Sequence, residues 1–462
     1  MLFTTFPFLI FLLLVLALFY ALPRRYRRYL LLAASLLFYM AWNAKFVFLI
    51  FGLITVDFFA ARWIAVRSGR ERRLALLVSL AANIGMLGFF KYANFAREIW
   101  AQVFRPGQMP QPLDILLPLG ISFHTFQSIS YVIDVYRGEQ AAVTSYVDYA
   151  LFVAFFPQLV AGPIVRAREF FHDLWHWRPP NAAEWQRGVA MVMTGFVKKL
   201  VFADRFALVA DPYFTNPAAL PGLLPAWTAT VSFALQIFFD FSGYTDIAIG
   251  TALLFGFHFP ENFRRPYLAA SITEFWRRWH MTLSRWLRDY IYIPLGGNRQ
   301  GEVRTYLNLM ITMLLGGLWH GASWNFIIWS GYHGALLAVE KKLQGRGQIT
   351  GMARIPAIPV TFLLVSIGWV FFRAKTLAAA LFVLTQMTAL RKDYGLSLLD
   401  HWHWGLAIFG LLIAVGEEYG ALWTRFTLAP AWARTLAMVA ALLAIELFSA
   451  TDRSIPFVYF QF

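Results

Sequence analysis

Long apolar stretches, separated by short polar ones, follow one another along almost the whole chain. A helix that crosses a bilayer needs about 20 mostly apolar residues. Some stretches are too short or too polar to cross, so the pattern predicts about 10–13 true spans together with re-entrant and interfacial helices. The candidate ranges are 2–22, 29–42, 46–61, 74–90, 114–136, 147–165, 188–210, 226–257, 306–324, 325–340, 356–372, 376–390, 403–422 and 430–448.

The composition also indicates a membrane protein. Apolar residues make up 59% of the 462 residues and charged residues 14%, against about 45–50% and about 25% in soluble globular proteins. The net charge is +15, but the basic residues lie in short clusters between apolar spans, which is typical of a polytopic membrane protein rather than a nucleic-acid-binding one. Cysteine is absent, which excludes disulfides and thiolate chemistry. We expect an all-α polytopic membrane protein with one domain over 1–462 and no separate soluble domain.

Clusters of arginine predict the orientation of the first spans. Four arginines lie within 24–28 and five within 62–73, whereas the turn between the second and third spans holds Lys45 alone. Basic loops remain on the cytoplasmic side, so both clusters are expected there and the N-terminus outside. Residues 2–22 lack a charged region before them and a small-residue cleavage site after them, so we expect a retained first span.

One polar segment has a helical pattern of its own. Residues 272–290 read ITEFWRRWHMTLSRWLRDY, and at helical spacing an aromatic face lies apart from an arginine face. This predicts an amphipathic interfacial helix with Thr273 as its N-cap. His280 lies at the edge of the aromatic face, where it is either part of a structural anchor or directed into the protein. The arginine face comprises Arg277, Arg278, Arg285 and Arg288.

A histidine ends another apolar stretch. His320 follows a long apolar run over 306–319 and is flanked by Trp319 and Gly321. Ionisable residues at membrane depth are costly and are candidates for function. A neutral imidazole can take a proton from an attacking hydroxyl during acyl transfer. The residues that could then donate to the oxyanion are Trp319, Ser323, Trp324 and Asn325. A structural histidine bonded to a carbonyl is the alternative.

Other chemistry has weaker support. Asp240 and Asp246 lie six residues apart in an apolar helix, where they could orient a histidine, bind a cation or line a proton path, or instead be satisfied by arginine or backbone. The pairs His172/His176 and His401/His403 lie in tryptophan-rich stretches that look interfacial, so we expect no metal. The chain has no H-E-x-x-H and no G-x-S-x-G motif.

Two stretches together resemble the membrane-bound O-acyltransferase (MBOAT) family. They are 271–301, which reads SITEFWRRWHMTLSRWLRDYIYIPLGGNRQG, and 314–334, which reads LLGGLWHGASWNFIIWSGYHG. Within the family they are most similar to the bacterial branch that takes part in alginate O-acetylation. Other stretches agree with that branch, so the resemblance runs from about residue 110 to the end; these are 118–138, 155–166, 236–250, 259–272 and 456–462.

The resemblance implies the MBOAT fold, with His320 at the position of the family's active-site histidine and His280 at that of the branch's second histidine. Asn262 lies in the branch's N-F-x-x-P-Y segment. The implied activity moves an acyl group, usually acetyl, from a cytoplasmic donor toward the outer face of the bacterial inner membrane. In this branch a separate periplasmic acyltransferase often completes the transfer to a polysaccharide. Arg264 and His124 depart from the branch's pattern, which bears on the assignment to alginate.

We therefore predict a membrane O-acetyltransferase that serves a polysaccharide such as alginate. His320 is the expected general base and His280 positions donor or acceptor. No cofactor is bound, the donor is acetyl-CoA, and the arginine face contacts phosphates of lipid or donor. The supporting residues are Asn262, Asp240, Asp246, Trp319 and Asn325.

Two kinds of alternative stay open. The same chemistry could act on peptidoglycan, cellulose or teichoic acid, or on a lipid or protein acceptor. A non-enzymatic transporter would use Asp57, Asp240 and Asp246 as an ion path. Many transporters have repeated halves, and this sequence has no visible internal repeat.

Overall fold

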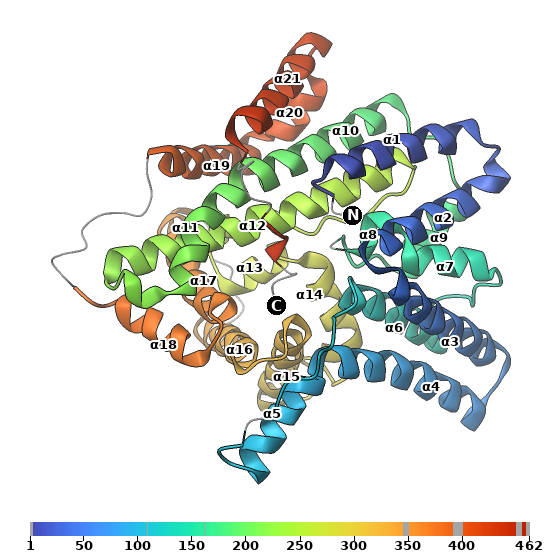
Figure 1. Cartoon of the computed structure of the whole chain (residues 1–462), viewed down its shortest axis with the longest axis horizontal. Coiled ribbons are helices and arrows are strands. Elements are labelled where there is room, and N and C mark those ends of the chain that lie inside the picture. The colour runs from blue at the N-terminus through green and yellow to red at the C-terminus, as the bar shows by residue number, and fades with distance from the viewer. Residues whose placement is uncertain are drawn as a thin grey trace. The chain divides into compact units, whose positions relative to one another are not determined.

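The computed structural model describes residues 3–108, 110–160, 162–344, 351–390, 401–449 and 455–458. Within these ranges the regular elements are all helices and there is no strand, which confirms the all-helical prediction (Figure 1). The chain forms two compact units. One comprises residues 1–192 and 247–260, and the other 193–246 and 261–462.

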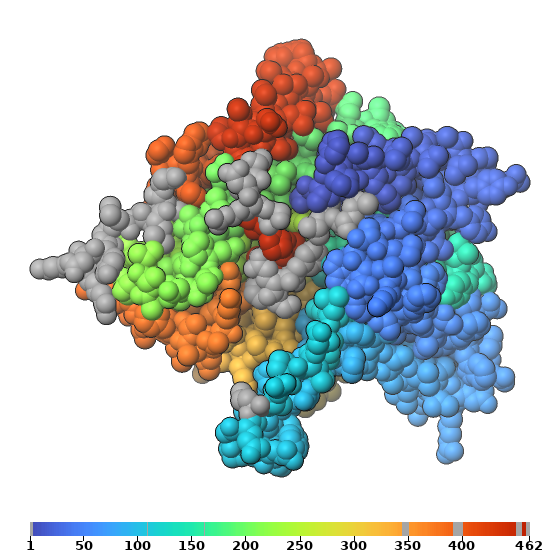
Figure 2. Space-filling view, in the orientation of Figure 1, coloured from blue at the N-terminus to red at the C-terminus, as the bar shows by residue number. Residues whose placement is uncertain are grey.

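The first unit is built from the N-terminal helices. Within it α3 packs against α4 and α6, and α2 packs against α7. Figure 2 shows α5 as a protrusion from this unit. Its elements are α1 (Phe6–Ala21), α2 (Arg24–Asn43), η1 (Ala44–Phe46), α3 (Val47–Val66), α4 (Gly69–Leu87), η2 (Gly88–Tyr92), α5 (Ala93–Phe104), α6 (Ile121–Arg137), α7 (Tyr146–Ala154), α8 (Phe156–Leu159), α9 (Ala167–Trp175) and parts of α10 (Ala182–Val197) and α12 (Leu223–Leu254).

The second unit contains the rest of α10 and α12 and the elements that follow them. The antiparallel neighbours α15 and α16 pack along each other, and α17 packs on α16 (Figure 1). No residue of α21 is buried, and Figure 2 shows this helix standing out from the unit. The further elements are η3 (Lys198–Ala203), α11 (Asp204–Thr215), η4 (Pro217–Ala219), η5 (Pro266–Leu268), α13 (Ile272–Arg278), α14 (Met281–Leu287), η6 (Arg288–Tyr292), α15 (Glu302–His320), α16 (Trp324–Gln344), η7 (Gly351–Ala353), α17 (Arg354–Arg373), α18 (Leu377–Gln386), α19 (His401–Gly420), α20 (Leu422–Leu428) and α21 (Ala431–Phe448).

Several segments can cross a membrane. Among the described residues, five are long and apolar enough, and six if the bent pair α19–α20 is one span. The five are Arg24–Val66, Gly69–Phe104, Leu223–Leu254, Gly351–Arg373 and Ala431–Phe448. A polytopic helical membrane protein is thereby confirmed, while the finer count of spans stays a prediction.

Three boundaries differ from the sequence-based expectation. The predicted span 147–165 is interrupted after Ala154, where Phe155 has a ψ of 114°. Pro157 has no N–H to donate to the carbonyl of Val153, and its ring would clash with that carbonyl in a continuous helix. The predicted span 114–136 becomes helical only at Ile121, after Gly120 with a φ of 69°. The arginines within 24–28 form the first turns of α2 instead of a loop.

Glycines allow α10 and α12 to pack closely. A Cβ added at Gly250 would lie 2.6 Å from the carbonyl oxygen of Gly188, and one added at Gly243 would lie 2.8 Å from that of Gly195. Small residues let helix backbones approach in this way, which raises van der Waals contact where no hydrophobic effect separates helix from lipid. This packing holds α12, whose polar residues adjoin the candidate site.

A histidine between two carboxylates ties together the end of α9, the start of α10 and the segment after α12. His258 Nδ1 lies 3.3 Å from Asp173 Oδ2, and its Nε2 lies 3.1 Å from Glu184 Oε1. Hydrogen bonding to Asp173 raises the pKa of His258. The hydrogen bond from Arg178 lowers the pKa of Glu184 to about 2. Both effects favour the imidazolium between the two carboxylates.

We expect this clamp to make stability depend on pH. The folded state binds the His258 proton more tightly, so its stabilisation is complete below the unfolded pKa of about 6.5 and is lost as pH rises through the higher folded pKa. Thermal unfolding in detergent should therefore shift to lower temperature as pH rises from about 6 to about 8, with a weaker shift in His258→Gln. His401→Gln, at an exposed histidine, is the control; an unchanged pH profile in His258→Gln would contradict the assignment.

Candidate active site

The single amphipathic helix predicted over 272–290 is wrong, because the segment divides into α13 and α14 at Trp279 and His280. His280 has left-handed backbone angles, φ 43° and ψ 53°, a conformation that costs a non-glycine residue about 1–2 kcal/mol. The N-cap of α13 is Ser271 and not Thr273, since Ser271 Oγ accepts the N–H of Glu274 at 3.2 Å. His280 thus lies at a corner between two short helices.

Asn262 holds this corner in place. Its Oδ1 accepts hydrogen bonds from the backbone N–H of Thr282 at 3.2 Å and from Thr282 Oγ1 at 2.9 Å, and it lies 3.1 Å from His280 Nδ1. The N–H of Met281 donates to the carbonyl of Asn262 at 2.9 Å. Because an amide oxygen only accepts, Nδ1 of His280 carries the hydrogen, and in the neutral ring Nε2 is the basic nitrogen.

The two histidines predicted from the resemblance lie next to each other. His320 is the last residue of α15, and its ring centroid lies 6.4 Å from that of His280. His280 is fully buried and His320 nearly so. Trp319 packs against both rings, with centroid distances of 4.9 Å to His320 and 5.8 Å to His280. The corner after α13 and the end of α15 therefore bring both imidazoles into one aromatic cluster.

An apolar cavity reaches His320. Its volume is about 190 Å³, and its walls come from α13, α14, η6, α15 and α16. Four leucines, one methionine and two tryptophans make most of the lining apolar, and Arg288 is its charged side chain. The lining residues are Trp276, Leu283, Ser284, Leu287, Arg288, Tyr292, Leu309, Thr312, Met313, Gly316, His320, Trp329 and Leu337. A buried histidine at an apolar cavity is suited to proton transfer on a substrate that has left water.

Comparison with protein families agrees with this geometry. Residues 139–377 match the family model of the membrane-bound O-acyltransferases. The chain belongs to the membrane-bound O-acyltransferase family. It is accordingly an enzyme, a multi-pass membrane protein that transfers acyl groups from an acyl donor.

The relatives of this MBOAT chain are named for different acceptors: alginate, peptidoglycan and teichoic acid. The chain is 45% identical over 379 residues to the probable alginate O-acetylase AlgI of Pseudomonas aeruginosa, covering 79% of this chain and 70% of that protein. It is 41% identical over 394 residues to the peptidoglycan O-acetyltransferase of Helicobacter pylori, covering 78% and 73%. It is 28% identical over 302 residues to the teichoic acid D-alanyltransferase of Bacillus subtilis, covering 61% and 75%.

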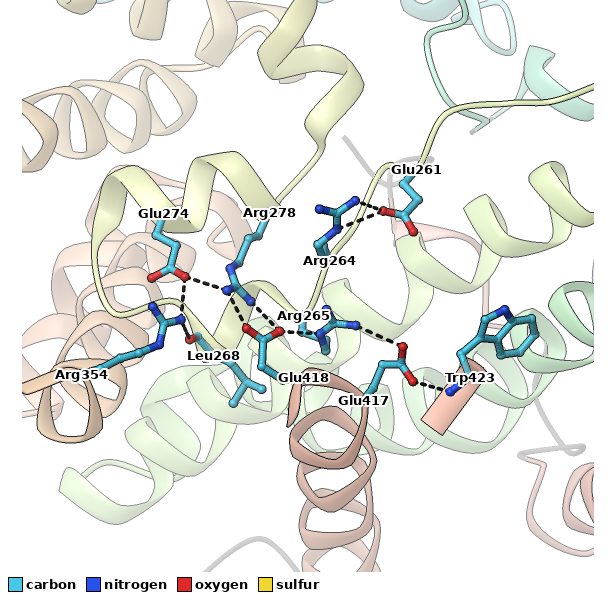
Figure 3. Close-up of polar contacts among 10 residues, drawn as sticks. All are labelled: Glu261, Arg264, Arg265, Leu268, Glu274, Arg278, Arg354, Glu417, Glu418 and Trp423. Carbon is cyan, nitrogen blue, oxygen red and sulfur yellow. Dashed lines mark hydrogen bonds and ion pairs between the residues drawn. The ribbon is translucent and has the colours of Figure 1, made fainter. Parts of the chain in front are cut away.

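In this MBOAT chain the arginine face predicted on 272–290 is divided between different surroundings. Arg278 donates to Glu418 at 2.7 Å and pairs with Glu274 at 2.7 Å (Figure 3). Glu418 also accepts from Arg265 at 2.7 Å, and Glu274 from Arg354 at 2.6 Å. Positive and negative side chains thus alternate through a network that joins α13, α17 and α19 and anchors the corner at His280.

The remaining arginines of that face lie differently. Arg277 is exposed, Arg285 is half-buried, and Arg288 is exposed with Nε 2.8 Å from Asp289 Oδ1. Arg288 also lines the cavity. Contact with phosphates of lipid or donor stays a prediction, and Arg278, with two carboxylate partners, is the member least able to make it.

The aspartates of α12 are held by lysines. Asp240 lies 2.9 Å from Lys199 Nζ and accepts the N–H of Val458 at 2.6 Å. Asp204 also lies 2.7 Å from Lys199 Nζ. Asp246 pairs with Lys198 at 2.5 Å. The partners are lysine and backbone, so these carboxylates have a structural explanation in place of an orienting contact to a histidine.

The C-terminal segment adjoins the same part of α12. Phe457 stacks against Tyr244 and Phe241, with ring centroids 4.3 Å and 5.8 Å apart, and Phe241 lies 4.8 Å from His280. The Asp240–Val458 hydrogen bond therefore fixes a segment that supports the back of His280. Asp240 supports the site indirectly, through packing.

Three further residues singled out from the sequence are the supporting residue Asn325 and the two departures from the branch's pattern, Arg264 and His124. Asn325 is buried, and its Nδ2 donates to the carbonyl of Ala374 at 2.7 Å, which ties α16 to the end of α17. Arg264 pairs with Glu261 at 2.6 Å in an exposed position (Figure 3), and His124 is buried in α6. Among the described residues there is no group of three or more potential metal ligands.

Sequence reasoning missed Trp329, which lies beside His320, and also His333 and Trp276, which lie beside Trp329. Trp329 lies 5.1 Å from His320 between ring centroids, and His333 lies 5.3 Å from both Trp329 and Trp276. Trp329 and His333 are four residues apart and share a helix face. That spacing could have indicated them, but tryptophans at helical spacing are more often core, and Trp276 appeared only as a membrane anchor.

We expect Asn262→Ala to disrupt the corner at His280. Three donors lose their acceptor in a buried place, so the free energy of unfolding should fall by about 2–4 kcal/mol, with loss of acyl transfer. Unfolding in mixed micelles measures the change. Asn298→Ala removes an exposed asparagine and should leave both properties intact; wild-type behaviour of Asn262→Ala would show that the corner holds without it.

We expect Lys199→Met to be strongly destabilising. The substitution leaves Asp204 and Asp240 buried without their cation, which costs about 3–5 kcal/mol. The same unfolding measurement tests it. Lys45→Met, at an exposed position, is the matched control. If both variants lowered the free energy of unfolding equally, the two aspartates would not carry a charge that needs Lys199.

Proposed function

We propose that this MBOAT enzyme is an O-acetyltransferase in which His320 is the general base. Its ring nitrogen takes the proton of an acceptor hydroxyl as the oxygen attacks the acyl carbon, and returns that proton to the leaving group. The observation that carries this proposal is the buried position of His320 at the end of an apolar cavity, 6.4 Å from His280 between ring centroids. A base in such surroundings acts without competition from water.

His280 positions the acceptor or donor in this scheme. Its Nδ1–H is engaged by Asn262, so Nε2 accepts a hydrogen bond from a hydroxyl. The left-handed backbone of His280 supports a functional role, because such strain clusters at active sites. Asn262, Trp319 and Asn325 support the two imidazoles through the contacts described, and Asp240 and Asp246 support them through α12.

The donor we propose is acetyl-CoA, presented from the cytoplasm, with the protein in the bacterial inner membrane. Most of the side chains that line the cavity are apolar, and its charged side chain is that of Arg288. This composition suits a thioester arm better than a sugar. The chain would act as one integral-membrane domain, since the family model runs through both compact units. A periplasmic acyltransferase partner would complete transfer outside the membrane.

The acceptor we propose is an extracytoplasmic polysaccharide, with alginate first. The relatives named for alginate O-acetylation are 43–46% identical, and the peptidoglycan O-acetyltransferase is 41% identical. Because these identities differ so little, peptidoglycan is the second candidate acceptor. Teichoic acid is less favoured, because that relative is 28% identical. An ion path through Asp240 and Asp246 loses support, since both carboxylates pair with lysines.

We expect His320→Ala to abolish acetyl transfer. Ester-linked acetate on surface polysaccharide is measured in the host, in a deletion strain, and in that strain complemented at equal membrane abundance with wild type or variant. Loss of a general base lowers rates by about 10²–10⁴-fold, so the variant should restore almost no ester.

The control for this experiment is His401→Ala, which removes an exposed histidine and should restore acetate fully. Full restoration by His320→Ala would overturn its role as base. If the deletion itself left the acetate unchanged, the polysaccharide acceptor would be wrong, and acetylated peptidoglycan would be measured in the same strains.

A further inference from the structure

Two tryptophans at the cavity have buried indole N–H groups without a hydrogen-bond partner among the described residues. They are Trp276 of α13 and Trp329 of α16. Both side chains line the cavity that contains His320. The ring of Trp329 lies 5.1 Å from that of His320 and 5.8 Å from that of Trp276, in edge-to-face arrangements. Two N–H donors from different helices therefore adjoin the proposed base.

A buried indole N–H without an acceptor costs free energy, and among the neighbouring tryptophans that the structure describes only the two at the cavity carry that cost. A buried donor without a partner costs about 1–3 kcal/mol, and buried indoles usually find one. Neighbouring tryptophans follow the rule: Trp369 donates to Tyr267 Oη at 3.1 Å, and Trp227 donates to the carbonyl of Met387 at 3.1 Å. The two exceptions belong to side chains that line the cavity, which suggests an acceptor from a molecule bound there.

Two hydroxyl groups of the cavity wall, those of Thr312 and Ser284, already have backbone carbonyl oxygens beside them. Thr312 Oγ1 donates to the carbonyl of Asn308 at 2.6 Å, and Ser284 Oγ lies 3.5 Å from the carbonyl oxygen of Trp279. The guanidinium of Arg288 is paired with Asp289. Of the remaining donors in the lining, the indole N–H of Trp329 belongs to the ring that packs against His320, and that of Trp276 belongs to the ring next to Trp329.

We propose that Trp276 and Trp329 are catalytic residues that donate hydrogen bonds to the acyl carbonyl oxygen as it becomes an oxyanion. This inference rests on the proposed function of His320. The acceptor hydroxyl loses its proton to His320 and its oxygen bonds to the thioester carbon, while the carbonyl π electrons move to the oxygen. The carbonyl then re-forms, the C–S bond breaks, and the thiolate takes the proton from His320. The indoles bind the oxyanion through both steps.

The test removes each N–H while keeping the ring. Trp329 and Trp276 are replaced singly by β-(3-benzothienyl)alanine, which has sulfur where indole has N–H, and in parallel by phenylalanine. Inverted membrane vesicles from the host deletion strain carry each variant, and initial rates are measured with acetyl-CoA as the varied donor. We expect kcat to fall about 10²-fold for each replacement, with KM for acetyl-CoA and the pH profile unchanged.

Trp369→Phe is the matched control. It removes a buried indole from the same aromatic cluster, stacked on Trp329 at 5.8 Å, but one that has its partner and does not line the cavity. It should lower thermal stability and keep kcat. Wild-type kcat in both benzothienyl variants, or a loss confined to KM, would overturn the proposal, with water or the ground-state donor then satisfying the indoles.

Assays in the same vesicles distinguish failure of the indole donors from failure of His320 as general base. Loss of activity in His320→Ala together with active tryptophan variants would reject the indole donors alone. Activity in His320→Ala would reject the general base itself. A rate loss that phenylalanine causes and benzothienylalanine does not would assign the effect to ring shape and would also reject the donors.

Discussion

The amide oxygen of Asn262 is the interaction on which the geometry of the site depends. In an apolar interior each backbone N–H must find an acceptor, and the break between α13 and α14 would otherwise leave the N–H of Thr282 without one. Asn262 supplies that acceptor and also receives Nδ1 of His280. One side chain therefore caps the start of α14, holds His280 in a left-handed conformation and sets which of its nitrogens is basic.

The charged residues of the second unit follow the same constraint. Lys199 lies between Asp204 and Asp240, and Arg278 lies between Glu274 and Glu418. Removing ions from water is costly unless each is paired, so these groups form closed networks around the site. The space beside His320 is left to neutral rings and aliphatic side chains, in which an uncharged imidazole is the favoured form.

The sequence carried the class of fold and both histidines, but not the way in which they meet. Apolar stretches near 20 residues predict helices in a membrane, and they are there. Helical spacing placed His280 on a continuous face, because the pattern of one segment holds no information about Asn262, 18 residues earlier. Arg278 looked available for phosphate for a similar reason, since its partner Glu418 is 140 residues away. Long-range polar contacts decided both cases.

The arrangement of donors also bears on which substrate enters the cavity. A sugar has hydroxyl groups on most of its carbons, and these groups would lose hydrogen bonds to water on entering a cavity whose lining is mostly apolar. A thioester arm has one reactive carbonyl, and the two indole N–H groups match that single oxygen. Under the proposed function the cavity therefore favours the acyl donor over the sugar acceptor, with the carbonyl oxygen of the donor toward the two indoles.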